Sequence, residues 1–232
     1  MKTKQIRYCF RMPNNSREDF KFELNPRSLE LKDNIPQRLP GWAKLDFHQC
    51  PNCPFDVVTH PHCPLAANLV HIVQRFDGLV SFEEITVDVI TEERRITQQT
   101  TAQTGISSMM GLVIATCGCP HTTFFKSMAW FHLPLASEEE TILRATSMYL
   151  LAQYYKQKEG WSADFEFEGL ARIYNNMKIV NLSIAKRLRE AVITDSSVNA
   201  LVLLDNFAQT LPFVIEESLE EIRHLFSPFL SR

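Results

Sequence analysis

Cysteine placement is the feature that most constrains this chain. Of its six cysteines, five fall in three short segments, and four of those five are followed directly by proline. A set of thiolates drawn from separate segments is what a soft metal ion or an iron–sulfur cluster requires. The segments are Cys50-Pro-Asn-Cys-Pro54, His60-Pro-His-Cys-Pro64 and Cys117-Gly-Cys-Pro-His121. We therefore expect a metal centre to hold these segments together.

The spacing of the cysteines predicts a ligand set. Cys50 and Cys53 are separated by two residues, as in a metal knuckle, where one tight turn presents two sulfurs to the same ion. With a third cysteine ten residues on and a Cys-x-Cys pair later, the predicted ligands are Cys50, Cys53, Cys63 and Cys119. Neighbouring residues are further candidates, with ordinary polar loop positions as the alternative for each histidine: Cys117, His60, His62 and His121.

The residues that follow the cysteines bear on which metal the site would bind. Zinc bound by four cysteines is the commonest structural solution. Many zinc knuckles have glycine after the second cysteine, whereas this chain has Pro54 there. Cys-Pro steps are typical of iron–sulfur ligands. Zinc is the expected cofactor, and an iron–sulfur cluster is the alternative.

Composition narrows the class of protein. Hydrophobic residues make up 45% and charged residues 22% of the 232 residues, which is ordinary for a folded protein. The net charge of −3 and the absence of a basic face give no reason to expect nucleic acid. No apolar run approaches the roughly 20 residues of a membrane span, and the start does not resemble a signal peptide. We expect a cytoplasmic protein, in which clustered cysteines serve as ligands and not as disulfides.

Alternating apolar and polar residues predict strands in the first hundred residues. The pattern covers 6–12, 20–24, 29–31 and 85–91, and residues 94–100 provide a fifth candidate. Such strands form an antiparallel sheet with one charged and one apolar face. Between them, the proline-rich stretch 33–63 has little periodicity, and metal ligation accounts for so long a loop.

Helical periodicity dominates the rest of the chain. It predicts six helices, over 64–76, 101–116, 137–158, 167–191, 197–210 and 212–226. The first has Cys63 as its N-cap, and the third begins with a capping box at Ser137 and ends at about residue 158. The predicted fold is α+β: a sheet of four or five strands packed on a C-terminal helical bundle, with the metal loop at the junction. We expect a single domain, 1–232, in which 1–100 is mostly sheet with the metal loop at 48–64, and 101–232 is the bundle.

Two classes of function remain open from the sequence. No phosphate-binding glycine loop, nucleophile elbow or metalloprotease helix is present, so an enzyme is the less favoured class. The first class is a metal-stabilised platform that binds a protein partner or responds to redox state. The second is a metal-dependent enzyme that uses His60, His62 or His121. The apolar seam of 167–191 requires a partner helix, which neighbouring helices of the same chain can supply; Asn181, a polar residue in the seam, suggests a homodimer as the alternative. Lys186, Arg187 and Arg189 are expected as helix-end cations.

The motifs also resemble those of an uncharacterised bacterial protein family. The resemblance is carried by Cys-Pro-x-Cys-Pro from Cys50, by Cys63-Pro-Leu-Ala, by Gly118-Cys-Pro, and by the segments 128–134 and 147–154. It covers most of the chain and implies no function. The family usually has serine at the position of Cys117, which weighs against that residue as a ligand.

Overall fold

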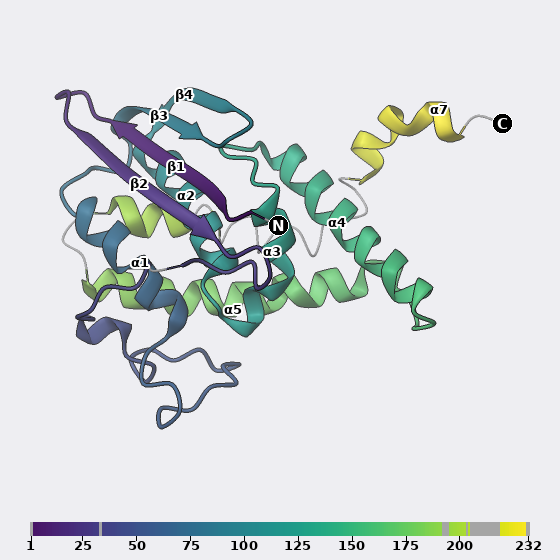
Figure 1. Ribbon diagram of the computed structural model, residues 1–232, viewed down its shortest axis with the longest axis horizontal. Helices are drawn as coiled ribbons and strands as arrows, with labels where there is room; N and C mark the ends of the chain where they lie inside the picture. Colours follow the sequence, from purple (N-terminus) through teal and green to yellow (C-terminus); the bar gives the residue numbers. More distant parts are fainter. Residues whose placement is uncertain (1, 33, 192–194, 203, 205–218, 231–232) are drawn as a thin grey trace.

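A four-stranded antiparallel sheet forms one layer of the protein (Figure 1). The computed structural model describes residues 2–32, 34–191, 195–202, 204 and 219–230. The strands are β1 (Lys4–Arg11), β2 (Arg17–Leu24), β3 (Glu84–Ile90) and β4 (Arg95–Thr101), in the order β2-β1-β3-β4. Two hairpins, β1-β2 and β3-β4, are thus joined through β1 and β3.

The two faces of the sheet differ as their alternation predicts. One face is buried, and it carries Ile6, Tyr8, Phe10, Phe20, Phe22, Ile85, Val87 and Val89. The other face carries ion pairs across the strands, such as Arg7 with Asp19 at 2.8 Å and Arg11 with Asp88 at 3.2 Å. Cys9 lies on this charged face opposite Asp19 and Asp88, far in sequence from the other cysteines.

Helices α1 (Pro64–Arg75) and α2 (Ala102–Thr116) cover the apolar face. Helix α2 approaches the sheet closely at Gly105, where an added Cβ would lie 2.8 Å from Cγ2 of Val87. A larger residue at this position would clash, so the glycine sets the distance between the two layers. Helix α2 begins with Thr101 as N-cap, whose side chain accepts a hydrogen bond from the Thr104 amide.

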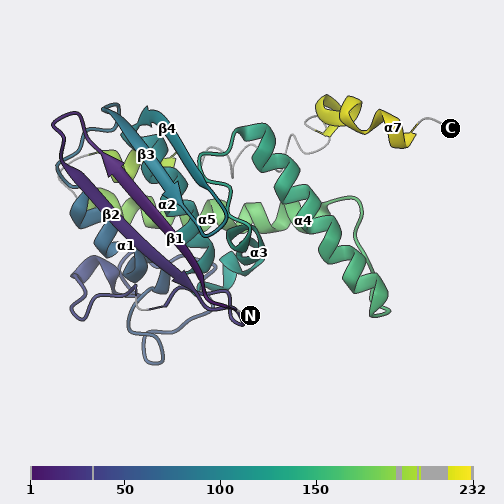
Figure 2. The same ribbon diagram turned by 45° about the horizontal axis from the view of Figure 1, so that its top comes forward.

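Further helices follow α2 in the chain. The first of them are η2 (Pro120–Phe125), α3 (Lys126–Trp130), α4 (Glu138–Lys158) and α5 (Glu168–Ala191). Helix α4 starts with the predicted capping box at Ser137, and Figure 2 shows its C-terminal half extending away from the body of the protein. Helix α5 runs under α1 and α2 in Figure 1, and its apolar row is buried within the chain: Leu170, Tyr174, Met177, Val180, Ile184 and Leu188. This row has partners inside the chain, and the homodimer stays a prediction.

The last part of the chain is only partly described. Residues 196–202 and 204 are helical, followed after a gap by 219–222, η3 (Arg223–Phe226) and α7 (Ser227–Leu230). The helix predicted over 197–210 is therefore seen in its first half. Most of the helix predicted over 212–226 lies outside the described residues. None of the described helices is by itself long and apolar enough to cross a membrane; α2 and the segment Pro120–Trp130 meet that test only as a pair bent by 112°.

The α+β prediction is confirmed. The segment 29–31, which was predicted as a strand, is not one of the four strands of the sheet. That segment makes only an isolated bridge, Leu31 with Leu24, at the outer edge of β2. Leu29 has a φ of 58°, which breaks an extended strand, and Leu31 donates its amide hydrogen bond to the carbonyl of Thr116 at the end of α2. The alternation of 29–31 was too short to outweigh the turn that begins at Asn25.

Candidate metal centre

The cysteine-rich loop is tied to the helical layer by its backbone. It begins after the short helix η1 (Gly41–Ala43) and returns to α1 through an isolated antiparallel bridge between Lys44 and His62. The amide of Cys63 donates to the carbonyl of Ala43 over 2.9 Å. As predicted, Cys63 is the N-cap of α1 and Pro64 its first residue. This closure brings Cys63 back beside the start of the loop.

The Cys50–Cys53 turn contacts two other parts of the chain. The turn itself is closed by a 3.0 Å hydrogen bond from the Cys53 amide to the Cys50 carbonyl. The side chain of Asn52 donates to Asn176 of α5 over 3.1 Å. Nε2 of His121 lies 2.7 Å from the carbonyl oxygen of Asn52, to which it donates. Segments separated by about seventy and more than a hundred residues therefore meet at one knuckle-like turn.

The reversal after α2 delivers the last cysteines. Cys117 is the C-cap of α2, and Cys119 is the N-cap of η2. Gly118 between them has a φ of 85°, in the left-handed region that favours glycine. This turn sends the chain back toward the Cys50–Cys53 turn, where His121 makes its hydrogen bond.

The structure brings the four predicted cysteines into electrostatic contact with one another. Burial raises the pKa of the Cys119 thiol to about 12, and the charges of Cys63, Cys50 and Cys53 act in the same direction. Burial also raises the pKa of Cys50, again reinforced by Cys63 and Cys53. Without a cation beside them, the thiols of Cys50 and Cys119 hold their protons at neutral pH, so a metal ion would bind there by displacing protons.

Two hydrogen-bonding groups already favour the thiolate form. The backbone amide of His121 lowers the pKa of Cys119, against the larger effect of burial. The hydroxyl of Ser183, on α5, does the same for Cys50. Hydrogen bonds of this kind to sulfur are the outer support by which proteins orient and tune metal thiolates.

Arg187 is the main residue of this region that the sequence interpretation missed. The sequence predicts it as a helix-end cation, and it does lie near the C-terminus of α5, but its side chain is only 1% exposed. Its guanidinium donates hydrogen bonds to three successive parts of the loop: the carbonyls of Trp42 at 2.9 Å, Lys44 at 2.5 Å and Leu45 at 2.9 Å. The sequence signal for its burial was that Arg187 directly precedes Leu188, a member of the apolar row of α5.

The charge on Arg187 faces the thiols. Burial lowers the pKa of this guanidinium, while the negative charges of Cys63, Cys50 and Cys53, and then Asp46, act in the opposite direction. In the part of the chain that the structure describes, no carboxylate lies within ion-pair distance of Arg187, and its Nε is buried without a hydrogen-bond partner. A buried cation in this position calls for a negative group nearby.

The further candidates occupy other roles. The thiol of Cys117 donates to the Ile114 carbonyl over 3.1 Å and is buried at the end of α2. His60 is exposed and stacks on Phe55 with ring centroids 3.9 Å apart. His62 pairs through its backbone, and His121 donates from Nε2 as described above. Only His121 among the three histidines is tied to the knuckle turn.

The thiols are gathered without forming a preassembled site. Within the described ranges, no group of three or more His, Cys, Asp or Glu side chains has the arrangement that could hold a metal ion. The four sulfurs come from three segments whose backbones are fixed, so coordination would require their side chains to turn toward a common point. The donor set fits zinc or an iron–sulfur cluster in chemistry, while its geometry is that of free thiols.

Comparison with known proteins places the chain in a family. A family model described as a domain of unknown function (DUF6901) matches residues 6–227. The match spans nearly the whole chain, and the protein belongs to this family. No curated protein and no solved structure matches it at a significant level.

Proposed function

We propose that this DUF6901 protein binds one zinc ion through Cys50, Cys53, Cys63 and Cys119, and that the ion fixes the loop 48–64. The observation that carries the proposal is the buried guanidinium of Arg187 beside three of the four thiols, those of Cys50, Cys53 and Cys63, with no carboxylate ion pair in the described residues. Four thiolates around Zn²⁺ have a net charge of minus two. Such a centre supplies the negative charge that Arg187 lacks.

The ligand set favours a structural role for the metal. Four protein thiolates fill the tetrahedral coordination of zinc and leave no position for water or substrate. The loop has little regular secondary structure of its own, and Arg187 holds only the segment just before it, at residues 42–45. Bonds to the metal would order the remainder, from the Cys50–Cys53 turn to Cys63.

An ordered loop would present a surface to a partner. Val58 is 94% exposed at the loop tip, beside the half-exposed Val57, in a turn held by Asp56. Apolar side chains at the tip of a metal-fixed loop suit recognition of another protein. We place this function in the cytoplasm, where thiols remain reduced and are free to serve as ligands.

Elemental analysis of anaerobically purified protein tests the proposal. One zinc per chain is expected, with no visible absorption, and it should be lost in Cys53→Ser and Cys63→Ser but retained in the matched control Cys9→Ser. A brown protein with iron and sulfide would assign an iron–sulfur cluster to the same ligands and a redox role. Less than about a tenth of a metal equivalent would show that the site holds neither.

A further inference from the structure

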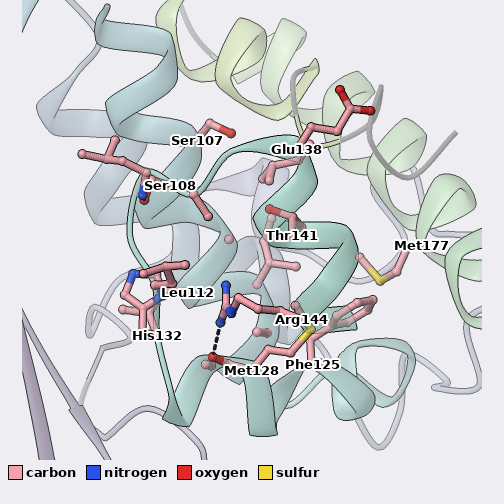
Figure 3. A pocket seen from close by; sticks show the side chains of 18 of the residues that line it. Ser107, Ser108, Leu112, Phe125, Met128, His132, Glu138, Thr141, Arg144 and Met177 are labelled. Atoms are coloured by element: carbon pink, nitrogen blue, oxygen red, sulfur yellow. Dashed lines mark hydrogen bonds between the residues drawn. The ribbon is translucent and has the colours of Figure 1, made fainter. Parts of the chain in front are cut away.

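A separate cavity lies among the helices, away from the cysteines. Its volume is about 620 Å³, within the range of about 300–1,000 Å³ typical of sites for small organic ligands. Residues of α2, α3, α4 and α5 line it, and Figure 3 shows their side chains converging on the space. None of the four predicted metal ligands is among them.

The wall of the cavity is mainly apolar. Leu112 comes from α2, Phe125 and Met128 from the segment of η2 and α3, and Met177 from α5. Gly111 leaves additional room, because an added Cβ there would come no closer than 3.8 Å to another side chain, that of Leu204. Methionine and aromatic side chains adapt their shape to apolar ligands.

Arg144 supplies a positive charge at one end of this apolar space. Its Nη2 donates to the carbonyl oxygens of Met128 at 2.8 Å and Phe131 at 3.2 Å. Among the described residues it forms no ion pair with a carboxylate; Glu140, one turn earlier, accepts a hydrogen bond from the Ser137 amide. Figure 3 shows Glu138 at the other end of the cavity, with its carboxylate turned away from Arg144.

Asn181 places a second polar group in the wall. It lines the cavity from α5 and is only 3% exposed. Its amide carries both a donor and an acceptor, so in a mainly apolar wall it offers a hydrogen-bonding contact to a ligand that brings a polar group.

Other polar groups of the wall bond to one another. The Leu135 amide donates to Ser108 Oγ over 2.8 Å, Ser108 Oγ lies 2.9 Å from the Tyr8 hydroxyl, and that hydroxyl lies 2.5 Å from Nε2 of His132. Burial lowers the pKa of His132 to about 3, helped by the charges of Arg144 and Lys4. The imidazole is neutral at physiological pH and shares a hydrogen bond with Tyr8. Arg144 and the exposed Glu138 are then the charged groups of the wall.

From these observations we propose that the cavity binds a medium-chain carboxylic acid, with its carboxylate on Arg144 and its apolar chain along Leu112, Phe125, Met128 and Met177. Asn181 provides a second polar contact within the same cavity. The proposal is independent of the metal centre, because the two sites share no residue.

Isothermal titration calorimetry with decanoate and with neutral decanol, both below their aggregation limits, tests this site. Decanoate should bind the full chain, and Arg144→Met should weaken it by at least about tenfold, the size expected for a hydrogen bond to a charged group. Decanol should bind both proteins alike. The exposed Arg172→Met, at a residue paired only with the exposed Glu168, is the matched control and should leave decanoate binding unchanged.

A second variant tests the cavity without disturbing its hydrogen bonds. Gly111→Met adds a side chain to the space, and it replaces a residue with low helix propensity by one with high propensity, so folding should be preserved. Binding of both decanoate and decanol should be lost. Equal decanoate affinity in the wild type, Arg144→Met and Gly111→Met would overturn the proposal, as would no binding to the wild type.

Discussion

The guanidinium of Arg187 lies 2.5 Å from the carbonyl oxygen of Lys44, so a residue of α5 holds the beginning of the cysteine-rich loop. The same side chain binds the carbonyls on either side, of Trp42 and Leu45. Arg187 therefore has two roles: it fixes the backbone at the beginning of the loop, and it brings a buried positive charge next to the thiols.

Arg187→Met should lower the free energy of unfolding by about 2–4 kcal/mol, because three buried carbonyls lose their donor. It should also reduce the zinc content, since the counter-charge of the thiolates is gone. Urea unfolding and elemental analysis measure the two effects. Arg189→Met, an exposed arginine of the same helix, is the control. If Arg187→Met retained full zinc and stability, the charge argument for the metal centre would fail.

Cys63→Ser should lower the melting temperature of the protein as isolated, because the loop loses both a ligand and its metal. Cys9→Ser should have little effect, since Cys9 lies on the charged face of the sheet, far from the other cysteines in sequence. Thermal unfolding followed by circular dichroism compares the two variants. Equal melting temperatures for Cys63→Ser and the wild type would refute the structural role of the metal.

The layers of the fold could be predicted where local signals and burial agreed. The capping box at Ser137 and the N-cap at Cys63 marked helix starts correctly because both depend on neighbouring residues. The segment 29–31 was misread as a strand because a left-handed turn at Leu29 overrides its short alternation. For the site, the spacing of the cysteines predicts a ligand set, while no group of three such side chains in the described residues is arranged to hold a metal ion.

The remaining features depend on long-range packing that no motif records. From its position in the sequence, Arg187 is predicted as a helix-end cation. Its burial could not be predicted, because it depends on contacts with a loop about 140 residues earlier in the chain. The cavity has no sequence signature, because its wall is assembled from four separate helical segments. Asn181 was noticed as a polar residue in an apolar row and interpreted as a dimer contact; the structure places it in the cavity wall.

Gly105→Ala should destabilise the protein by about 1–3 kcal/mol, the usual range for an overpacked core. The added Cβ would lie 2.8 Å from Val87 Cγ2 and 3.2 Å from both Ile85 Cδ1 and Phe10 Cε1. Gly111→Ala, on the same helix, meets no atom closer than 3.8 Å and should be neutral or stabilising. Urea midpoints of the two variants should therefore move in opposite directions from the wild type. A Gly105→Ala protein as stable as Gly111→Ala would mean that α2 can move away from the sheet freely.

Acid should destabilise the protein partly through His132. Its pKa is about 3 in the folded state, against about 6.5 in an unfolded chain, so the unfolded state binds the proton more readily. The contribution of the neutral imidazole is complete above about pH 6.5 and is lost progressively as the pH falls toward 3. His132→Phe should be less stable at neutral pH, because Tyr8 loses a hydrogen-bond partner. Its urea midpoint should change less than that of the wild type between about pH 7.5 and about pH 5.5. Parallel pH profiles for the two proteins would contradict the lowered pKa.

Asn181→Leu should raise the free energy of unfolding by about 1 kcal/mol, since it replaces a polar amide by an apolar side chain in a mainly apolar cavity wall. The same change at Asn176 should have the opposite sign, because that amide oxygen accepts a 3.1 Å hydrogen bond from Asn52 in the cysteine-rich loop. Urea unfolding of the two variants provides the comparison within one helix. Light scattering should give the same mass for the wild type and Asn181→Leu if the role of Asn181 is in the cavity wall that it lines. A lower midpoint for Asn181→Leu would show that its amide is satisfied in solution, and a change in mass would return it to a dimer interface.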